Sequence, residues 1–207
     1  MRISACIALT ALLASCQTGT ENPRVQQAEH EIIGGVLNSG DDAVVAVFVG
    51  GLCTGTLIAP RIVLTAAHCV ADAIVAGNTN AGSVRFGDGV SPWIESINIV
   101  DMSMHRLYKP PVFLQNDIAL VRLERDAPST ITPIPISTTN LTEDDIGLEI
   151  RVVGFGNTDG AAGTGAGQKR QVTMPLKELD SSHIGMGDHF YNTCQGESGG
   201  PSFATFG

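Results

Sequence analysis

The sequence predicts an all-β fold. Its 207 residues include 24 glycines and 10 prolines, and the apolar residues fall in short runs rich in valine and isoleucine. Short β-branched runs between glycine-rich turns are typical of strands. Long stretches of Ala, Glu, Lys and Leu at helical spacing are missing. A chain of this length often folds as one all-β unit, so we expect many short strands in a barrel or a sandwich.

Eight segments have the composition of short strands. They are 44–49, 55–58, 62–65, 84–86, 94–100, 118–123, 149–155 and 171–174. Residues 66–75 predict one or two helical turns. The glycine-rich segment 154–167 lacks the Gly-Lys-Ser/Thr ending of a phosphate-binding loop, and no helical pattern follows it. We expect it to be a loop.

The charge of the chain limits its partners. The formal net charge is −9, and Lys and Arg form no run. Binding of nucleic acid usually requires a basic surface. We therefore expect a soluble, acidic domain that does not bind nucleic acid.

The N-terminus predicts export. Arg2 precedes an apolar stretch, residues 3–14, that is too short to span a bilayer but suits a signal peptide covering residues 1–15. The sequence Leu-Ala-Ser-Cys ending at Cys16 resembles a bacterial lipobox, which predicts lipid on that cysteine; the alternative is an ordinary signal peptide with a chance cysteine. Gln17 after Cys16 favours the outer membrane. Residues 16–31 are polar and predict a tether or propeptide.

Export makes the cysteine count informative. An oxidising compartment permits disulfides. Removal of Cys6 with the signal and lipid on Cys16 leave Cys53, Cys69 and Cys194. An odd number leaves one cysteine without a partner in the chain.

Three short motifs carry residues with reactive side chains. They are LTAAHC with His68, NDIALVRL with Asp117, and GESGGP with Ser198. Each has an ordinary explanation when taken alone. A lone histidine is commonly a core residue, and His68 has no second ligand at metal-binding spacing. An aspartate before a strand is commonly a cap, and Gly-x-Ser-x-Gly patterns recur by chance.

Together, in the order His68, Asp117, Ser198, the motifs resemble those of the chymotrypsin-like (trypsin family) serine proteases. The resemblance covers residues 32–207, and IIGG at 32–35 and VGFG at 153–156 extend it. It implies a double six-stranded β-barrel. Because the family continues well beyond its serine and this sequence ends nine residues after Ser198, we expect the second barrel to be incomplete and the chain to be truncated.

The resemblance also implies roles for these residues. His68 is expected to be the general base, Asp117 the carboxylate that orients it, and Ser198 the nucleophile of an endopeptidase. Imidazole suits this task because it exchanges a proton near neutral pH. The backbone N–H groups of Gly196 and Ser198 would form the oxyanion hole. No cofactor is implied.

Further family features map onto this sequence. Cys53 and Cys69 match the disulfide that holds the histidine loop, which leaves Cys194 unpaired. Cleavage before Ile32 would free an amine that pairs with Glu197, where the family usually has Asp. Asn192 would lie at the floor of the substrate pocket. The cut would follow Glu31, so either the activating protease prefers glutamate or the chain is trimmed in steps, Arg24 being the nearby basic residue.

These expectations define partners and rivals. The partners would be protein or peptide substrates, an activating protease, and a membrane reached only through lipid on Cys16. Activation would release the protease as a periplasmic or secreted form. Asp88, in Gly-Asp-Gly, has the composition of a calcium loop, but a turn is by far the commoner explanation and no metal is expected. The rival interpretations are an inactive protease-fold scaffold and a truncated remnant.

Overall fold

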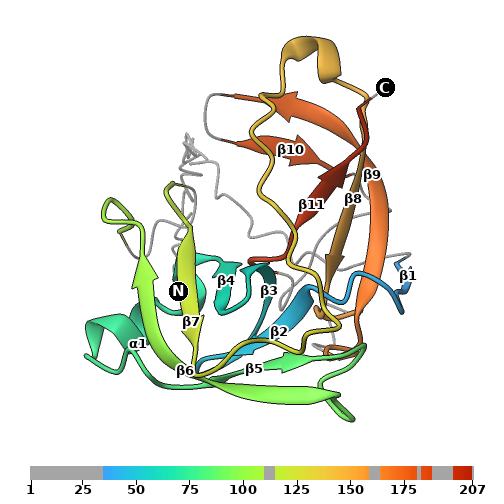
Figure 1. The fold of residues 1–207 in the computed structure, drawn as a ribbon. Helices are drawn as coiled ribbons and strands as arrows, with labels where there is room; N and C mark the ends of the chain where they lie inside the picture. Colours follow the sequence, from blue (N-terminus) through green and yellow to red (C-terminus); the bar gives the residue numbers. More distant parts are fainter. Residues whose placement is uncertain (1–34, 110–114, 159–163, 181–182, 188–197, 207) are drawn as a thin grey trace, which may run out of the picture.

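The computed structural model describes residues 35–109, 115–158, 164–180, 183–187 and 198–206 (Figure 1). The described chain is mostly β-structure. Its elements are β1 (Val36–Leu37), β2 (Val44–Phe48), β3 (Leu52–Ala59), β4 (Ile62–Thr65), η1 (Ala67–Cys69), α1 (Ala71–Val75), β5 (Ser83–Phe86), β6 (Glu95–Met104), β7 (Ala119–Leu123), η2 (Glu143–Asp145), β8 (Glu149–Gly154), β9 (Arg170–Leu179), β10 (Ile184–Met186) and β11 (Ser202–Ala204). None of the helices in these ranges is long and apolar enough to cross a membrane.

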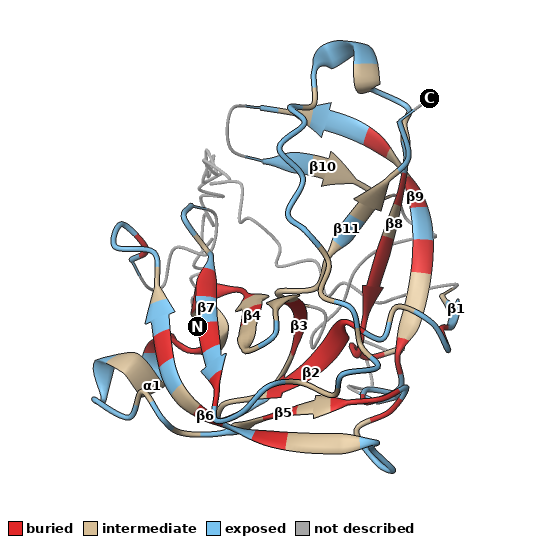
Figure 2. Cartoon of the chain, viewed as in Figure 1, coloured by how far each residue is buried: buried red, intermediate tan, exposed pale blue. Residues whose placement is uncertain are grey.

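The first half of the chain closes into a six-stranded barrel. Its strand order is β2-β3-β4-β7-β6-β5, and every neighbouring pair within it is antiparallel. In β7, Ala119, Val121 and Leu123 are buried while Leu120 and Arg122 are exposed, which is the alternation expected of a strand with one face in a core. Most of the buried apolar residues of these strands, coloured red in Figure 2, belong to one continuous hydrophobic cluster.

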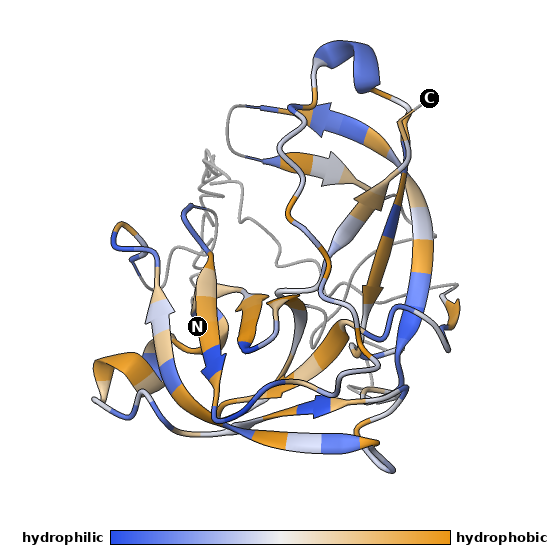
Figure 3. Ribbon diagram, viewed as in Figure 1, coloured by the Kyte–Doolittle hydropathy of each residue, from blue (hydrophilic) through white to orange (hydrophobic). Residues whose placement is uncertain are grey.

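The second half forms an open, five-stranded sheet. Its order is β1-β9-β8-β11, with β10 paired to β9. The long strands β8 and β9 carry its core, and β11 pairs only with β8 among the described strands. The hydrophilic tip of this half in Figure 3 is η2, which consists of three acidic residues. The first barrel confirms the predicted fold, and the second sheet is not closed within the described residues.

The two sheets share a small apolar core. Val44 and Ala46 from β2 and Val153 and Phe155 from the end of β8 are buried against one another. Because the barrel interior takes the other face of β2, this strand is buried on both sides and four of its five residues are inaccessible. Hydrophobic burial therefore joins the two halves.

Polar contacts also join the halves. Lys169, which is completely buried, places its Nζ 3.2 Å from Asp88 Oδ1 on the β5–β6 loop. Arg151 on β8 donates through both terminal nitrogens to the carboxylate of Asp41, with one distance of 3.1 Å. Asn38 adds a 2.7 Å bond to Asp41. The carboxylate of Asp88 is therefore the ion-pair partner of Lys169 rather than a free ligand for a cation.

All eight predicted strands are present. Their ends differ by a few residues; the largest extensions are in β3, β6 and β9. The predicted turns at 66–75 are η1 and α1, and the described parts of 155–167 contain no strand. The strands β1, β10 and β11 were not predicted. Each has only two or three residues, which is too short for an alternating pattern to show.

Candidate active site

His68 and Asp117 are held together by two hydrogen bonds. The Asp117 carboxylate accepts from the His68 ring through Oδ2, 2.7 Å from Nδ1, and from the His68 backbone N–H through Oδ1, at 2.8 Å. His68 lies in η1 after β4, and Asp117 lies just before β7. Since β4 and β7 are paired neighbours, with Thr65 opposite Ala119, the barrel brings the two motifs side by side.

The residue before Asp117 adopts an unusual backbone conformation. Asn116 has a φ of 56°, in the left-handed region that asparagine tolerates better than most residues. The Asn116 carbonyl accepts a 2.9 Å bond from the N–H of Ile118. This tight turn lets the chain pass Asp117 and enter β7 directly, so Asn116 helps to aim the carboxylate.

A disulfide supports the histidine from the other side. Cys53 on β3 is bonded to Cys69, directly after His68, which confirms the expected pairing. The sulfur atoms and a ring nitrogen of His68 lie within 4.8 Å of one another. Both sulfurs are bonded to each other and are not thiolates, so this trio is not a metal-binding set. Its role is to clamp η1 onto β3.

The turn at Ser198 and Gly199 docks on the same end of the barrel. The Ser198 carbonyl oxygen accepts a 3.0 Å bond from the backbone N–H of Thr54, and Cys69 Sγ lies 3.7 Å from that oxygen. Gly199 has a φ of +84°, and a Cβ there would lie 2.3 Å from Thr65 Oγ1 and 2.6 Å from the Ala66 nitrogen. Only glycine permits this approach. The turn therefore lies against the chain that leads into His68.

The electrostatics of the pair favour an ionised carboxylate. Burial by itself raises the pKa of Asp117, but the bonds from His68, its charge and the backbone amide of Ala67 outweigh this and hold that pKa below its ordinary value. Tyr108 is buried nearby, and burial together with the charges of Asp117 and Asp72 raises its pKa. Asp117 thus stays an anion that can accept from the imidazole.

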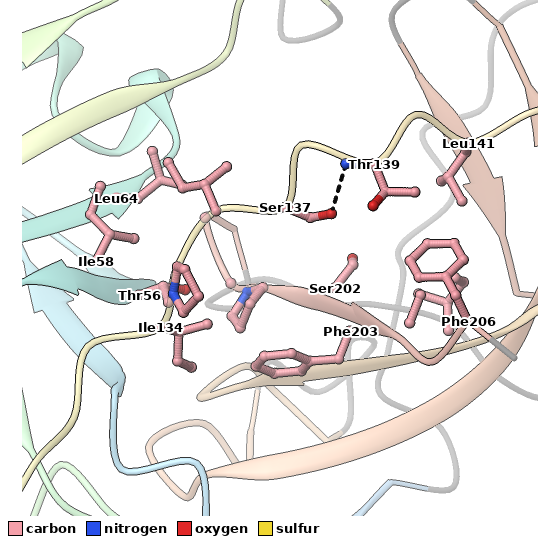
Figure 4. Close-up of a pocket in the computed structure, with 17 residues that line it drawn as sticks. Thr56, Ile58, Leu64, Ile134, Ser137, Thr139, Leu141, Ser202, Phe203 and Phe206 are labelled. Carbon is pink, nitrogen blue, oxygen red and sulfur yellow. Dashed lines mark hydrogen bonds between the residues drawn. The ribbon is translucent and has the colours of Figure 1, made fainter.

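Two hollows adjoin the site on different sides. The first has a volume of about 430 Å³ and lies between the barrel and β11, with Ile58, Leu64, Ile134, Phe203 and Phe206 among its apolar lining (Figure 4). The second, of about 520 Å³, is lined by His68 together with Asp72 and several small residues. His68 lines only the second of these two hollows.

Several predicted residues cannot be placed. Cys16, Ile32, Asn192, Cys194, Gly196 and Glu197 lie outside the described residues. The structure also reveals residues that the sequence did not single out. Asn116 and Gly199 hold left-handed conformations next to Asp117 and Ser198, and Thr54 binds the Ser198 carbonyl. The sequence offered one signal for Asn116 and Gly199, since Asn and Gly are the residue types that tolerate a left-handed conformation. It offered none for Thr54, whose contact with Ser198 is made by a backbone N–H that any residue except proline has.

Comparison with known sequences agrees with this architecture. The sequence model of the family described as Trypsin matches residues 32–207. The CLIP domain-containing serine protease B10 of Anopheles gambiae is 28% identical over 178 residues, covering 72% of this chain and 49% of that protein. Brachyurin of Leptuca pugilator is 33% identical over 167 residues, covering 72% of this chain and 69% of that protein. The chain thus spans about half of the first relative's length.

Solved structures share the fold. Neuropsin, described as a serine protease expressed in the limbic system of mouse brain, superposes with a TM-score of 0.69 at 23% identity, covering 84% of this chain and 82% of its own. A mutant of human heparin binding protein (CAP37) gives 0.68 at 22% identity, covering 84% and 80%. With a closed six-stranded barrel, a second sheet and a family match across residues 32–207, this chain belongs to the trypsin family of serine proteases.

Proposed function

We propose that this protein is a serine endopeptidase that uses Ser198 as nucleophile, His68 as general base and Asp117 as the group that orients His68. One observation carries the proposal. Segments 49 and 81 residues apart in sequence, those of His68, Asp117 and Ser198, meet at one end of the first barrel, with the imidazole bonded to the carboxylate. Protein or peptide substrates follow from membership of the family.

The chemistry proceeds in two halves. Ser198 Oγ attacks the substrate carbonyl carbon while its proton passes to the free ring nitrogen of His68, forming a C–O bond. The negative charge on the carbonyl oxygen is met by the backbone N–H groups of Ser198 and Gly196. His68 then gives its proton to the amine nitrogen as the C–N bond breaks. Water repeats the sequence on the resulting acyl-enzyme and restores Ser198.

Covalent labelling tests the proposal. A fluorophosphonate probe reacts with an activated serine, so we expect labelling of the intact protein at Ser198 and none in Ser198→Ala. His68→Ala should remove the label as well, because the hydroxyl then lacks a base. A matched control is His183→Ala, an exposed histidine directly before β10, which should label normally. Equal labelling of wild type and His68→Ala would contradict the proposed base.

A binding scaffold is the second candidate. The same fold is found in a solved structure described as a mutant of human heparin binding protein, so this fold also occurs in a protein described by what it binds. The scaffold has a distinct signature. The processed protein would fail to label with fluorophosphonate and fail to cleave a protein substrate, yet would unfold cooperatively. A remnant without a function would lack the cooperative transition.

The proposal includes activation by cleavage before Ile32. The family match begins at Ile32, and the chain soon afterwards is attached to the second sheet through β1, where Arg170 Nη1 donates to the Gly35 carbonyl at 3.3 Å. The freed amine of Ile32 would pair with Glu197. Removing one member of such a pair costs about 3–5 kcal/mol when the pair is buried. Glu197→Gln should therefore weaken labelling of the cleaved form strongly.

Export completes the proposal. Residues 1–15 would direct the chain out of the cytoplasm, and Cys16 would carry lipid. The cut before Ile32 lies between the lipid and residues 32–207, so activation would free the protease from its membrane. Intact mass of the native protein checks this. A mature chain that begins at Ile32 and still carries lipid would contradict it.

A further inference from the structure

The hollow beside His68 has an unusual lining. It is about 520 Å³ in volume, and five of its described lining residues are glycine or alanine. These are Gly50, Gly51, Ala73, Ala76 and Ala81. A Cβ added at Gly50 or Gly51 would meet nothing within 4 Å, so the hollow is open there. The space can take a long side chain.

One charged group that lines the hollow has no counter-ion among the residues that the structure describes. Asp72 is exposed on α1 and lines the hollow, and no Lys or Arg is among the described lining residues. Two other acids of the barrel are paired: Asp101 lies 3.5 Å from Arg122, and Glu95 bonds Arg125. In the ranges that the structure describes, no ion pair involves Asp72.

The hollow lies on the side of His68 where the leaving half of a substrate would pass. In the proposed reaction, His68 delivers its proton to the leaving amine, so residues after the cleaved bond pass on the His68 side. His68 lines this hollow, whereas it does not line the apolar hollow of about 430 Å³ beside β11. Asp72 and His68 line the same hollow, so the carboxylate lies on the side of the imidazole where the leaving half would pass.

We propose that Asp72 selects substrates with a lysine or arginine shortly after the cleaved bond, whose cationic end group is received in the hollow beside His68. This inference rests on the proposed endopeptidase function. The long aliphatic stem of such a side chain would lie along the alanine and glycine lining, with its charge near the Asp72 carboxylate. Because Asp72 is exposed, the preference should be modest, about three- to fivefold, and weaker in high salt.

The test separates the hollow from the catalytic machinery. Fluorescent peptide pools, mixed before the bond, carry either lysine or its uncharged analogue norleucine at the first two positions after it. Anisotropy with the Ser198→Ala protein measures binding without cleavage. We expect the lysine pool to bind about three to five times more tightly, and Asp72→Asn to abolish that ratio. Asp144→Asn is the matched control, because it removes the same charge from η2 on the other half of the molecule.

A second variant tests the volume. Gly51→Leu places a side chain in open space and should weaken both pools equally, since it fills the hollow without changing its charge. The inference is overturned if Asp72→Asn keeps the lysine preference, if Asp144→Asn removes it equally, or if Gly51→Leu binds both pools normally. Loss of fluorophosphonate labelling in the wild type would instead reject the proposed function, and the binding ratio would still decide the role of Asp72.

Discussion

Asp117 binds His68 twice, once at the ring and once at the backbone. The second bond is important because it fixes the carboxylate to the η1 backbone. The orientation of the carboxylate therefore does not depend on the His68 ring alone. The Cys53–Cys69 disulfide holds the same segment, because Cys69 directly follows His68. The orientation of the imidazole therefore depends on β3, β4 and β7 together.

Asp117→Asn should inactivate the protein without unfolding it. The amide oxygen can still accept from the His68 backbone, but its NH₂ would face Nδ1 and favour the wrong ring tautomer. In the proposed mechanism this lowers kcat/KM for a peptide substrate by about 10³–10⁴. Thermal unfolding should change by only a few degrees. A variant that keeps a tenth of the activity would show that the carboxylate does not orient the base.

Asn116 offers a test of how Asp117 is aimed. With a φ of 56°, glycine should be accepted in its place, whereas a β-branched residue is strained there. We expect Asn116→Gly to keep the labelling rate at Ser198 within about twofold, and Asn116→Val to lower the free energy of unfolding by about 1–2 kcal/mol. Labelling should slow in Asn116→Val only. Equal labelling rates in the two variants would show that the conformation of Asn116 does not control the orientation of Asp117.

Gly199→Ala should be far more harmful than its conformation alone explains. Gly147 is a matched control, because its φ of +94° is also left-handed but a Cβ there meets nothing within 4 Å. Both substitutions carry a strain of about 1–2 kcal/mol. At Gly199 the new methyl also meets Thr65 and Ala66, adding about 1–3 kcal/mol. We expect chemical denaturation to show this excess, and labelling at Ser198 to be lost only in Gly199→Ala.

The contact between Asp41 and Arg151 predicts a pH dependence of stability. The hydrogen bonds from Arg151 come first among the groups that hold the pKa of Asp41 below its ordinary value of 3.8, against an opposing effect of burial. A depressed pKa means that the contribution is complete above about pH 4 and is lost as the pH falls through the lower, folded value. Asp41→Asn should cost about 1.5–3 kcal/mol at pH 7.

The control for that variant is its neighbour. Asp42 is exposed and has no ion pair among the residues described, so Asp42→Asn should leave the unfolding curve near that of the wild type. In Asp41→Asn the difference from wild type should shrink below pH 4, because the wild-type carboxyl group is then protonated too. A difference that stays constant down to pH 2 would assign the loss to packing.

The parts of the fold that could be predicted are those determined by short, continuous segments of sequence. Strands such as β2 and β7 follow from apolar runs, and the reactive residues lie in short motifs. The strand β1 could not be found in this way, because its two residues form a strand only by pairing with Gln171 and Arg170, more than a hundred residues away. The Asp41–Arg151 and Asp88–Lys169 pairs likewise depend on how the two sheets meet. The proposed role of Asp72 also depends on a hollow whose lining residues come from separate segments of the chain.

The shared core of β2, with Val44 and Ala46 packed on Val153 and Phe155, has a mechanical consequence. A strand that belongs to both hydrophobic layers cannot be released from one without exposing the other, so neither half should melt alone. Calorimetry should record a single heat-absorption peak whose van't Hoff and calorimetric enthalpies agree. The distance between the first barrel and the second sheet should therefore stay constant in the native state, because both are built on the same strand.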